Sequence, residues 1–224
     1  MLYDDITKSL HRKNPFDGFL TDELIKQTGF GGDLSPVLQG IDERRQNKTV
    51  LVVEVGSWLG YSAEMIGTRL KNLRPGSDTC LICVDTWLGS SDFIVNKDGK
   101  RSKQYDELEM KNGYPRIYYS FMSAIMNSGL SDVVVPFAMT SVGAADVLHQ
   151  LKISADIVFI DAGHTYEDVS MDITSWSKIV KSDGLLVGDD IGFPGVKKAV
   201  EEFSTKRGNR YVRRNRYWIM PFKK

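Results

Sequence analysis

Short apolar runs alternate with amphipathic stretches along most of this chain. Runs of β-branched and other apolar residues, bounded by polar or turn residues, predict strands at 49–55, 79–85, 132–137, 155–161 and 184–189. Helical spacing of apolar residues predicts helices at about 60–72, 103–111, 116–128, 141–151, 165–180 and 194–206, after an earlier helix from Pro36 to about Gln46. Such alternation is typical of a mainly parallel sheet with helices on both faces, so we expect an α/β fold.

The two ends of the chain depart from this alternation. Residues 211–220 form two short runs around a tight turn, which predicts a closing hairpin with an antiparallel strand. Residues 1–33 show no regular pattern and include the glycine-rich break 29–32. We therefore expect an N-terminal extension with one helix over 1–48 and a single domain over 49–224.

The first strand ends on an acid and then turns through two glycines into a helix. This stretch reads Glu54-Val55-Gly56-Ser57-Trp58-Leu59-Gly60-Tyr61-Ser62. In an open α/β sheet, the carboxyl end of a central strand is where ligands bind. The next strand ends on Asp85, whose carboxylate can accept hydrogen bonds from both hydroxyls of a ribose. Together these features predict a nucleoside cofactor.

The spacing of the glycines distinguishes between nucleosides. A dinucleotide site needs Gly-x-Gly-x-x-Gly, whereas here Trp58 and Leu59 separate Gly56 from Gly60. The charge of Glu54 repels phosphate and suits a sulfonium nucleoside that carries an ammonium group. An NAD-dependent oxidoreductase is accordingly disfavoured. The alternative is a plain strand–turn–helix unit whose glycines serve packing.

Three further acids follow later strands. Asp161 ends the fourth strand, and Asp189 and Asp190 end the fifth. Carboxyl ends of parallel strands share one edge of the sheet, and like charges at close range disfavour one another. A hard divalent cation, Mg²⁺ or Ca²⁺ before zinc, relieves this repulsion. The alternative is that Asp189 and Asp190 cap a loop by bonding to backbone amides.

These motifs together resemble those of a known enzyme family. Residues 54–62, the run from Ile160 to Val169, the run from Gly184 to Asp190 and the run from Gly195 to Val200 resemble class I S-adenosylmethionine-dependent methyltransferases. The pattern is that of methyltransferase family 24, related to catechol O-methyltransferases and including macrolide-sugar and cephalosporin-type O-methyltransferases. The likeness spans about 49–206, with Asp183-Gly184 in place of the more common Gly-Gly.

The resemblance implies a Rossmann-like fold, with a mostly parallel seven-stranded sheet and a C-terminal antiparallel hairpin. It also implies Asp161, Asp189 and Asp190 as Mg²⁺ ligands, with the metal holding substrate hydroxyls. The residues that would hold S-adenosylmethionine are Glu54, Gly56, Ser57, Trp58, Gly60, Tyr61, Ser62, Asp85, Thr86, Ser141 and Asp161.

His164 is the candidate base. It lies three residues after Asp161, where catechol-type relatives carry a lysine base, and imidazole titrates near neutral pH. Alternatively, His164 only begins the following helix, although Thr165 and Asp168 already form a capping pair for that helix. Ser141 has two compatible interpretations, as a bond to the adenine edge or as a helix N-cap.

Composition restricts the partners. Lys plus Arg and Asp plus Glu both number 29, which gives no sign of nucleic acid or of an anionic membrane. No membrane-span or signal-peptide pattern is found, so we expect a cytoplasmic protein. Cys80 and Cys83 would point to opposite faces of a strand and are interpreted as buried apolar residues. The basic end, 206–216, reads as a solvated hairpin face or as a contact for an anionic substrate.

We therefore expect a Mg²⁺-assisted O-methyltransferase that acts on a hydroxyl of a small molecule, such as a sugar or a secondary metabolite. The polar stretch 86–104 is either a loop that caps the substrate or a solvated connection. A homodimer through the N-terminal extension is a further hypothesis. The alternatives are metal-independent methylation of an amine or protein side chain, and a non-catalytic nucleoside-binding protein.

Overall fold

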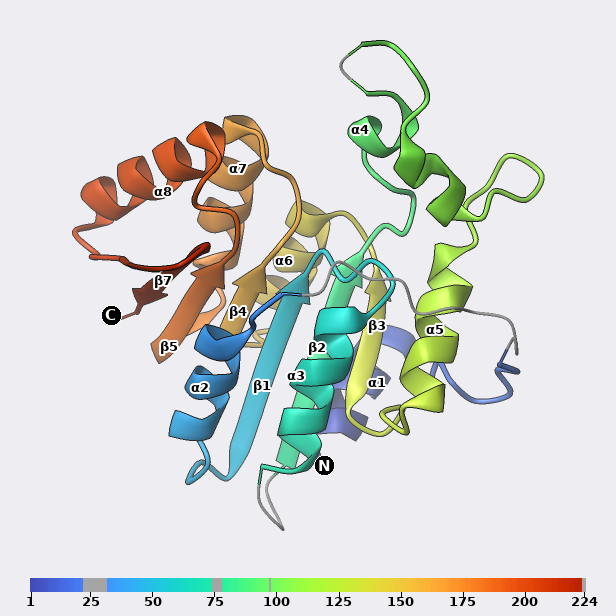
Figure 1. The fold of residues 1–224 in the computed structure, drawn as a ribbon. Helices are drawn as coiled ribbons and strands as arrows, with labels where there is room; N and C mark the ends of the chain where they lie inside the picture. Colours follow the sequence, from blue (N-terminus) through green and yellow to red (C-terminus); the bar gives the residue numbers. More distant parts are fainter. Residues whose placement is uncertain (22–31, 74–77, 97, 223–224) are drawn as a thin grey trace.

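The protein is built around one mixed β-sheet. A computed structural model describes residues 1–21, 32–73, 78–96 and 98–222. Within these ranges the sheet has seven strands in the order β3-β2-β1-β4-β5-β7-β6 (Figure 1). The first five are parallel, whereas β7 runs antiparallel to β5 and to β6, which confirms the expected fold. The strands are β1 (Thr49–Val55), β2 (Asp78–Asp85), β3 (Val134–Ala138), β4 (Ala155–Ile160), β5 (Val180–Gly188), β6 (Val212–Arg214) and β7 (Tyr217–Pro221).

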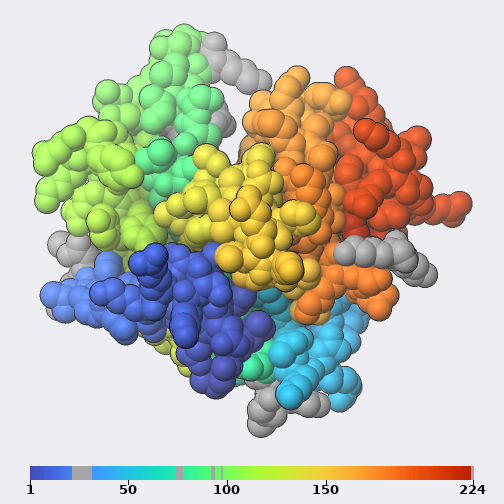
Figure 2. Space-filling view, turned by 180° about the vertical axis from the view of Figure 1, so that it is seen from behind, coloured from blue at the N-terminus to red at the C-terminus, as the bar shows by residue number. Residues whose placement is uncertain are grey.

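Helices cover both faces of the sheet. One face carries α2 (Ser35–Glu43), α3 (Tyr61–Lys71) and α5 (Ile117–Asn127). The other carries α1 (Leu2–His11), α6 (Ser141–Gln150), α7 (Tyr166–Trp176) and α8 (Pro194–Arg207). The view from behind shows the N-terminal segment in blue beside the segment around α6 in yellow (Figure 2). Two layers of helices therefore enclose the sheet.

The alternation of side chains along each strand builds two cores. Leu51 and Val53 of β1 pack into the core that contains α6 and α7, whereas Val52 packs into the core that contains α3. Cys80 and Cys83 of β2 follow the same rule, since they are buried free thiols in opposite cores. The interpretation of both cysteines as buried apolar residues is confirmed.

Several boundaries differ from the sequence-based prediction. Residues 2–11 form α1, which the sequence analysis did not predict. Few residues of this helix, Tyr3 and Ile6 among them, bury an apolar side chain against the sheet, so the helical pattern in the sequence is weak. β5 starts at Val180, inside the expected helix 165–180, because Val180 pairs with Ala155 ahead of a register shift. The expected helix 103–111 is the shorter 3-10 helix η1 (Lys103–Leu108). The glycine-rich residues 29–31 lie outside the described ranges.

The strand order reverses between β1 and β4. At such a switch point the loops leaving neighbouring strands diverge and open a crevice at the carboxyl ends. The loops after β1, β2, β4 and β5 therefore meet at one edge of the sheet. Among the helices of the described ranges, none is long and apolar enough to cross a membrane.

Candidate active site

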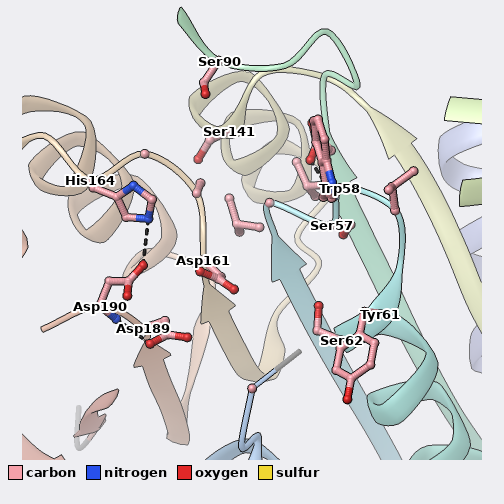
Figure 3. A pocket seen from close by; sticks show the side chains of 18 of the residues that line it. Ser57, Trp58, Tyr61, Ser62, Ser90, Ser141, Asp161, His164, Asp189 and Asp190 are labelled. Atoms are coloured by element: carbon pink, nitrogen blue, oxygen red, sulfur yellow. Dashed lines mark hydrogen bonds and ion pairs between the residues drawn. The ribbon is translucent and has the colours of Figure 1, made fainter. Parts of the chain in front are cut away.

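A cavity of about 740 Å³ lies at this edge of the sheet, a size suited to a small-molecule ligand (Figure 3). Of the residues expected to form the site, most line it. These are Gly56, Ser57, Trp58, Tyr61, Ser62, Asp85, Thr86, Ser141, Asp161, His164, Asp189 and Asp190. The sequence thus identified one continuous surface from motifs spread over more than half of the chain.

The loop after β1 needs glycine at one position for a steric reason. Gly56 has a φ of 93°, and a Cβ there would lie 2.0 Å from the carbonyl oxygen of Asp161. The amide N–H of Asp161 in turn donates to the carbonyl of Val55 at 2.8 Å. Close contact between these two backbones brings the first and fourth strand ends together.

Asp85 organises the part of the cavity formed by the loops after β1 and β2. Its Oδ2 accepts the N–H of Trp58 at 2.9 Å, and its Oδ1 accepts the N–H of Trp87 at 2.8 Å. Burial raises the pKa of Asp85, and these backbone N–H groups lower it in part. Each oxygen keeps a second lone pair, so the carboxylate can still accept hydroxyl donors from the cavity. Trp87 is buried and does not line the cavity, and it donates its Nε1–H to the carbonyl of Trp58 at 2.7 Å, so it supports the loop after β1 from behind.

Two of the expected cofactor residues lie behind the cavity wall. Glu54 is fully buried and Gly60 is the N-cap of α3, and neither lines the cavity. Burial raises the pKa of Glu54, while the nearby hydroxyls of Ser62 and Ser57 lower it. Among the described residues, Glu54 Oε1 and Ser57 Oγ have no hydrogen-bond partner with favourable geometry. Glu54 therefore lies under the loop as a buried acid and does not contact the cavity directly.

Ser141 lines the cavity but does not cap α6. The cap is Thr140, whose Oγ1 accepts the N–H of Gly143 at 3.3 Å. The hydroxyl of Ser141 donates to Asp172 and accepts the Nε1–H of Trp176 at 2.8 Å. The N-cap interpretation of Ser141 is therefore wrong, and its hydroxyl belongs to a network that fixes α6 against α7.

The far end of the cavity is acidic. Burial, followed by the charges of Asp189 and Asp190, raises the pKa of Asp161 to about 7. His164 Nε2 lies 2.8 Å from Asp190 Oδ2 (Figure 3), and the hydrogen bond from His164 lowers the pKa of Asp190. One donor atom each from Asp161, His164 and Asp190 can be chosen so that all three lie within 4.8 Å of one another. Two carboxylates and an imidazole so close together fit a divalent cation.

Asp189 differs from the expectation that it joins Asp161 and Asp190 as a ligand. Its Oδ1 accepts the N–H of Asp190 at 2.6 Å, so the alternative of a backbone amide bond holds for this acid. Asp189 Oδ1 also accepts the Nε–H of Arg216, whose Nη2 lies 3.2 Å from Asp190 Oδ1. Arg216 supplies a counter-charge for this pair of acids.

Arg216 is the main residue that the sequence analysis missed. The basic end 206–216 was interpreted as a solvated hairpin face or as a contact for an anionic substrate, and Arg216 was not named as a site residue, yet it lines the cavity together with Tyr217. Two observations could have identified it, namely that the acids lacked a counter-charge and that the hairpin returns beside the fifth strand. Burial raises the pKa of Tyr217, whose hydroxyl has no hydrogen-bond partner among the described residues.

His164 does not begin the following helix. Thr165 is the N-cap of α7, because its Oγ1 accepts the N–H of Asp168 at 3.1 Å, which confirms the expected capping pair. The ring of His164 stacks on Phe193 with centroids 5.0 Å apart. Its position at the cavity is therefore fixed by Asp190 and Phe193.

Comparison with known proteins agrees with this geometry. A family model described as a methyltransferase domain, that of methyltransferase family 24, matches residues 53–191. The chain belongs to this family. It is therefore an S-adenosylmethionine-dependent methyltransferase. A search of curated protein sequences gives no match.

Solved structures of similar fold include three methyltransferases with low sequence identity. The O-methyltransferase NovP is 20% identical, covering 85% of this chain and 79% of its own, with a TM-score of 0.63. The calicheamicin methyltransferase CalS11 is 10% identical, covering 100% and 92%, with a TM-score of 0.58. TomG from Streptomyces achromogenes, solved with S-adenosylmethionine, is 15% identical, covering 100% and 90%, with a TM-score of 0.53. At these identities the likeness supports the fold.

Two segments complete the cavity of this methyltransferase. Gly89 and Ser90, from the stretch after β2, line it, and the same stretch continues into α4 (Ser91–Ile94). Gly32 and Leu34, just before α2, line it from the other side. The stretch 86–104 thus contributes to the cavity at its start, and the N-terminal region contributes as well.

Proposed function

We propose that this methyltransferase transfers the methyl group of S-adenosylmethionine to a hydroxyl of a small molecule, with His164 as the base. The observation that carries the proposal is the His164–Asp190 pair, which shares one cavity with the Gly56 loop and Asp85. The loop and Asp85 would bind the cofactor, and the pair would face the acceptor. Methyl transfer is an in-line displacement, so alignment of oxygen, carbon and sulfur supplies much of the rate.

The proton of the acceptor hydroxyl would go to His164. When the N–H of Nε2 is directed to Asp190, the neutral imidazole carries its basic lone pair on Nδ1, which is the proton acceptor that we propose. The carboxylate also stabilises the imidazolium that forms. Asp190 is therefore a positioning group for the base.

A divalent cation, Mg²⁺ in our proposal, would be held by Asp161 and Asp190. These two acids were expected as ligands from the sequence, and they also belong to the close group that they form with His164 in the structure. When bound, it lowers the pKa of a coordinated hydroxyl. The raised pKa of Asp161 supports this assignment, because a cation would offset the repulsion from the neighbouring acids.

The names of the structural neighbours support a hydroxyl acceptor. NovP is named an O-methyltransferase, and CalS11 is named a TDP-rhamnose 3′-O-methyltransferase in calicheamicin biosynthesis. A sugar or sugar-bearing metabolite is accordingly the acceptor class that we propose.

A second candidate is the same reaction without a metal. It is favoured by Arg216, which already provides a positive charge to Asp189 and Asp190. Activity measured in Mg²⁺ and in excess EDTA separates the two, since full activity in EDTA contradicts the metal-assisted reaction.

The test compares His164→Ala with His149→Ala, because His149 lies exposed on α6 outside the cavity. Release of S-adenosylhomocysteine is measured with a panel of hydroxylated glycosides and phenols. We expect His164→Ala to lose a factor of about 10²–10⁴ in rate, while His149→Ala keeps its rate. Calorimetric affinity for S-adenosylmethionine should stay within a few fold in both. Equal rates of the two variants from pH 6 to 9 would exclude His164 as the base.

A further inference from the structure

The position of Arg216 is fixed by strand pairing. In the antiparallel register of β5 and β7, Gly188 lies opposite Trp218. Arg216 lies in the turn just before β7, and the N–H of Ile191, just after the end of β5, donates to the Arg216 carbonyl at 2.9 Å. The backbone of Arg216 is therefore bonded to the segment after β5, beside Asp189 and Asp190.

Arg216 contacts Asp189 and one oxygen of Asp190, an acid that also belongs to the candidate cation group. Its Nε–H donates to Asp189 Oδ1, which already accepts the N–H of Asp190, and Nη2 lies 3.2 Å from Asp190 Oδ1. The side chain of Asp189 is only 4% exposed, whereas that of Arg216 is 49% exposed, so the carboxylate of this ion pair is shielded from water and the guanidinium is partly solvated. Asp189 is therefore engaged away from the group that Asp161, His164 and Asp190 form.

We propose that Arg216 is a tethered counter-cation that competes with a divalent ion for the acidic end of the cavity. The inference rests on the metal site of the proposed function. A guanidinium stays charged at all physiological pH values, so it repels an arriving cation and also stabilises the acids without one. The metal affinity of this enzyme is thus set low by the β6–β7 hairpin, and the ion exchanges with solvent instead of remaining permanently bound.

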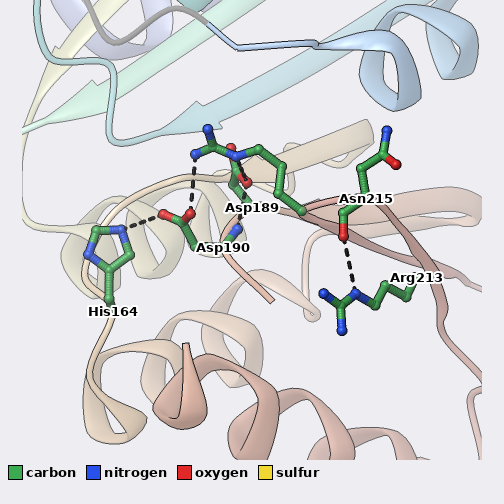
Figure 4. Close-up of polar contacts among 6 residues, drawn as sticks. His164, Asp189, Asp190, Arg213 and Asn215 are labelled. Carbon is green, nitrogen blue, oxygen red and sulfur yellow. Dashed lines mark hydrogen bonds and ion pairs between the residues drawn. The ribbon is translucent and has the colours of Figure 1, made fainter. Parts of the chain in front are cut away.

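The test measures metal binding, with Mn²⁺ as the probe and without acceptor. Arg216→Gln removes the competing charge. Arg213→Gln removes the same charge from the same hairpin, but Arg213 donates its Nε–H to the carbonyl of Asn215 at 3.1 Å (Figure 4). Free Mn²⁺ is titrated against each purified full-length protein at constant ionic strength and followed by electron paramagnetic resonance.

We expect Arg216→Gln to bind Mn²⁺ at least tenfold more tightly than the wild type, and Arg213→Gln to bind within twofold of it. In EDTA, Arg216→Gln should melt at a lower temperature than the wild type. Saturating Mn²⁺ should raise the melting temperature of Arg216→Gln by more than it raises that of the wild type. If Arg216→Gln does not fold, Arg216→Met, which keeps the apolar stem of the side chain, replaces it.

Three results would overturn the inference, and they differ in what else they affect. Equal or weaker Mn²⁺ binding by Arg216→Gln refutes competition while leaving the metal site in place. A similar gain in Arg213→Gln shows that only overall charge matters. Absence of Mn²⁺ binding in every variant at millimolar concentration refutes both the inference and the cation of the proposed function, although His164 can still act as the base.

Discussion

Gly56 lacks a side chain where the backbone of Asp161 occupies the space. A Cβ at this position would lie 2.0 Å from a carbonyl oxygen, in addition to the strain of a φ of 93°. Gly129 is a suitable control, because its φ is 67° but nothing lies within 4 Å of a Cβ there. The two positions separate backbone strain from steric overlap.

We expect Gly129→Ala to lower the free energy of unfolding by about 1–2 kcal/mol, from left-handed strain alone. Gly56→Ala should cost clearly more and should weaken binding of S-adenosylhomocysteine by over tenfold, because the β1 loop must move away from β4. Urea denaturation and calorimetry measure the two effects. Equal stability losses would show that the close approach at Gly56 relaxes without cost.

The charge of Asp161 gives the metal-free protein a specific pH dependence. Its pKa in the folded protein is about 7, raised by burial and by Asp189 and Asp190, against about 3.9 in an unfolded chain. Between these values the folded state holds a proton that the unfolded state releases, so this group destabilises the fold as the pH rises.

We therefore expect Asp161→Asn, measured in EDTA, to gain stability relative to the wild type as the pH rises from 5 to 7. The gain should level off above about pH 7.5. Urea denaturation of both proteins at each pH measures this difference. Parallel profiles would show that Asp161 titrates near its ordinary value in the folded protein.

At the scale of elements, the hairpin of β6 and β7 depends on a glycine in its neighbour. A Cβ on Gly188 would lie 2.2 Å from ring atoms of Trp218, which is buried against β5. This contact lets β7 pair closely with β5, and it thereby positions Arg216 and Tyr217 at the cavity. Gly192, in the following turn, has nothing within 4 Å of a Cβ.

Gly188→Ala should lower the free energy of unfolding by several kcal/mol, since the indole must shift and the pairing must open, whereas overpacking alone costs about 1–3 kcal/mol. Gly192→Ala should change it by less than about 0.5 kcal/mol. Hydrogen exchange gives an independent measurement, because amides of β7 should lose protection in the first variant only. Unchanged protection of β7 would contradict this role of Gly188.

Elements whose signals are local could be predicted from the sequence. The capping pair of Thr165 and Asp168 lies within one turn, and the apolar runs of β1 and β4 are fully buried strands. The start of β5 depends on pairing with Ala155, which is distant in sequence, and it was missed. Local patterns determine which elements form, whereas pairing between them determines several of their boundaries.

The candidate site divides in the same way. Acids and glycines at strand ends are predictable, because parallel strands bring their carboxyl ends to one edge. Arg216 reaches that edge only through the antiparallel register of β7, and Glu54 lies under the loop because of the side that the pleat gives it. Which side chains line a cavity and which support it from behind depends on packing, which a single sequence does not reveal.

For the whole molecule, the N-terminal region belongs to the packed body of the protein. The hydroxyl of Tyr3 donates to the carbonyl of Ser131 at 2.6 Å, and the N–H of Leu2 donates to Asp78 at 2.9 Å. Ile6 is 4% exposed and lies in the same core as α6 and α7. The expected boundary between an extension 1–48 and a domain 49–224 stays a prediction, and cooperativity of unfolding tests it.

Ile6→Ala and Lys8→Ala change a buried and an exposed residue of the same helix. If α1 unfolds together with the sheet, Ile6→Ala lowers the free energy of the single global transition by about 2–5 kcal/mol, because the cavity it leaves lies within the shared core. Lys8→Ala should stay within about 0.5 kcal/mol of the wild type. Circular dichroism and tryptophan fluorescence, recorded over the same urea series, should report one coincident transition. An early transition of α1 alone, with the main transition unchanged in Ile6→Ala, would show instead that residues 1–48 are an appended segment. The reason is that a substitution in α1 can destabilise the sheet only if α1 shares the core with it.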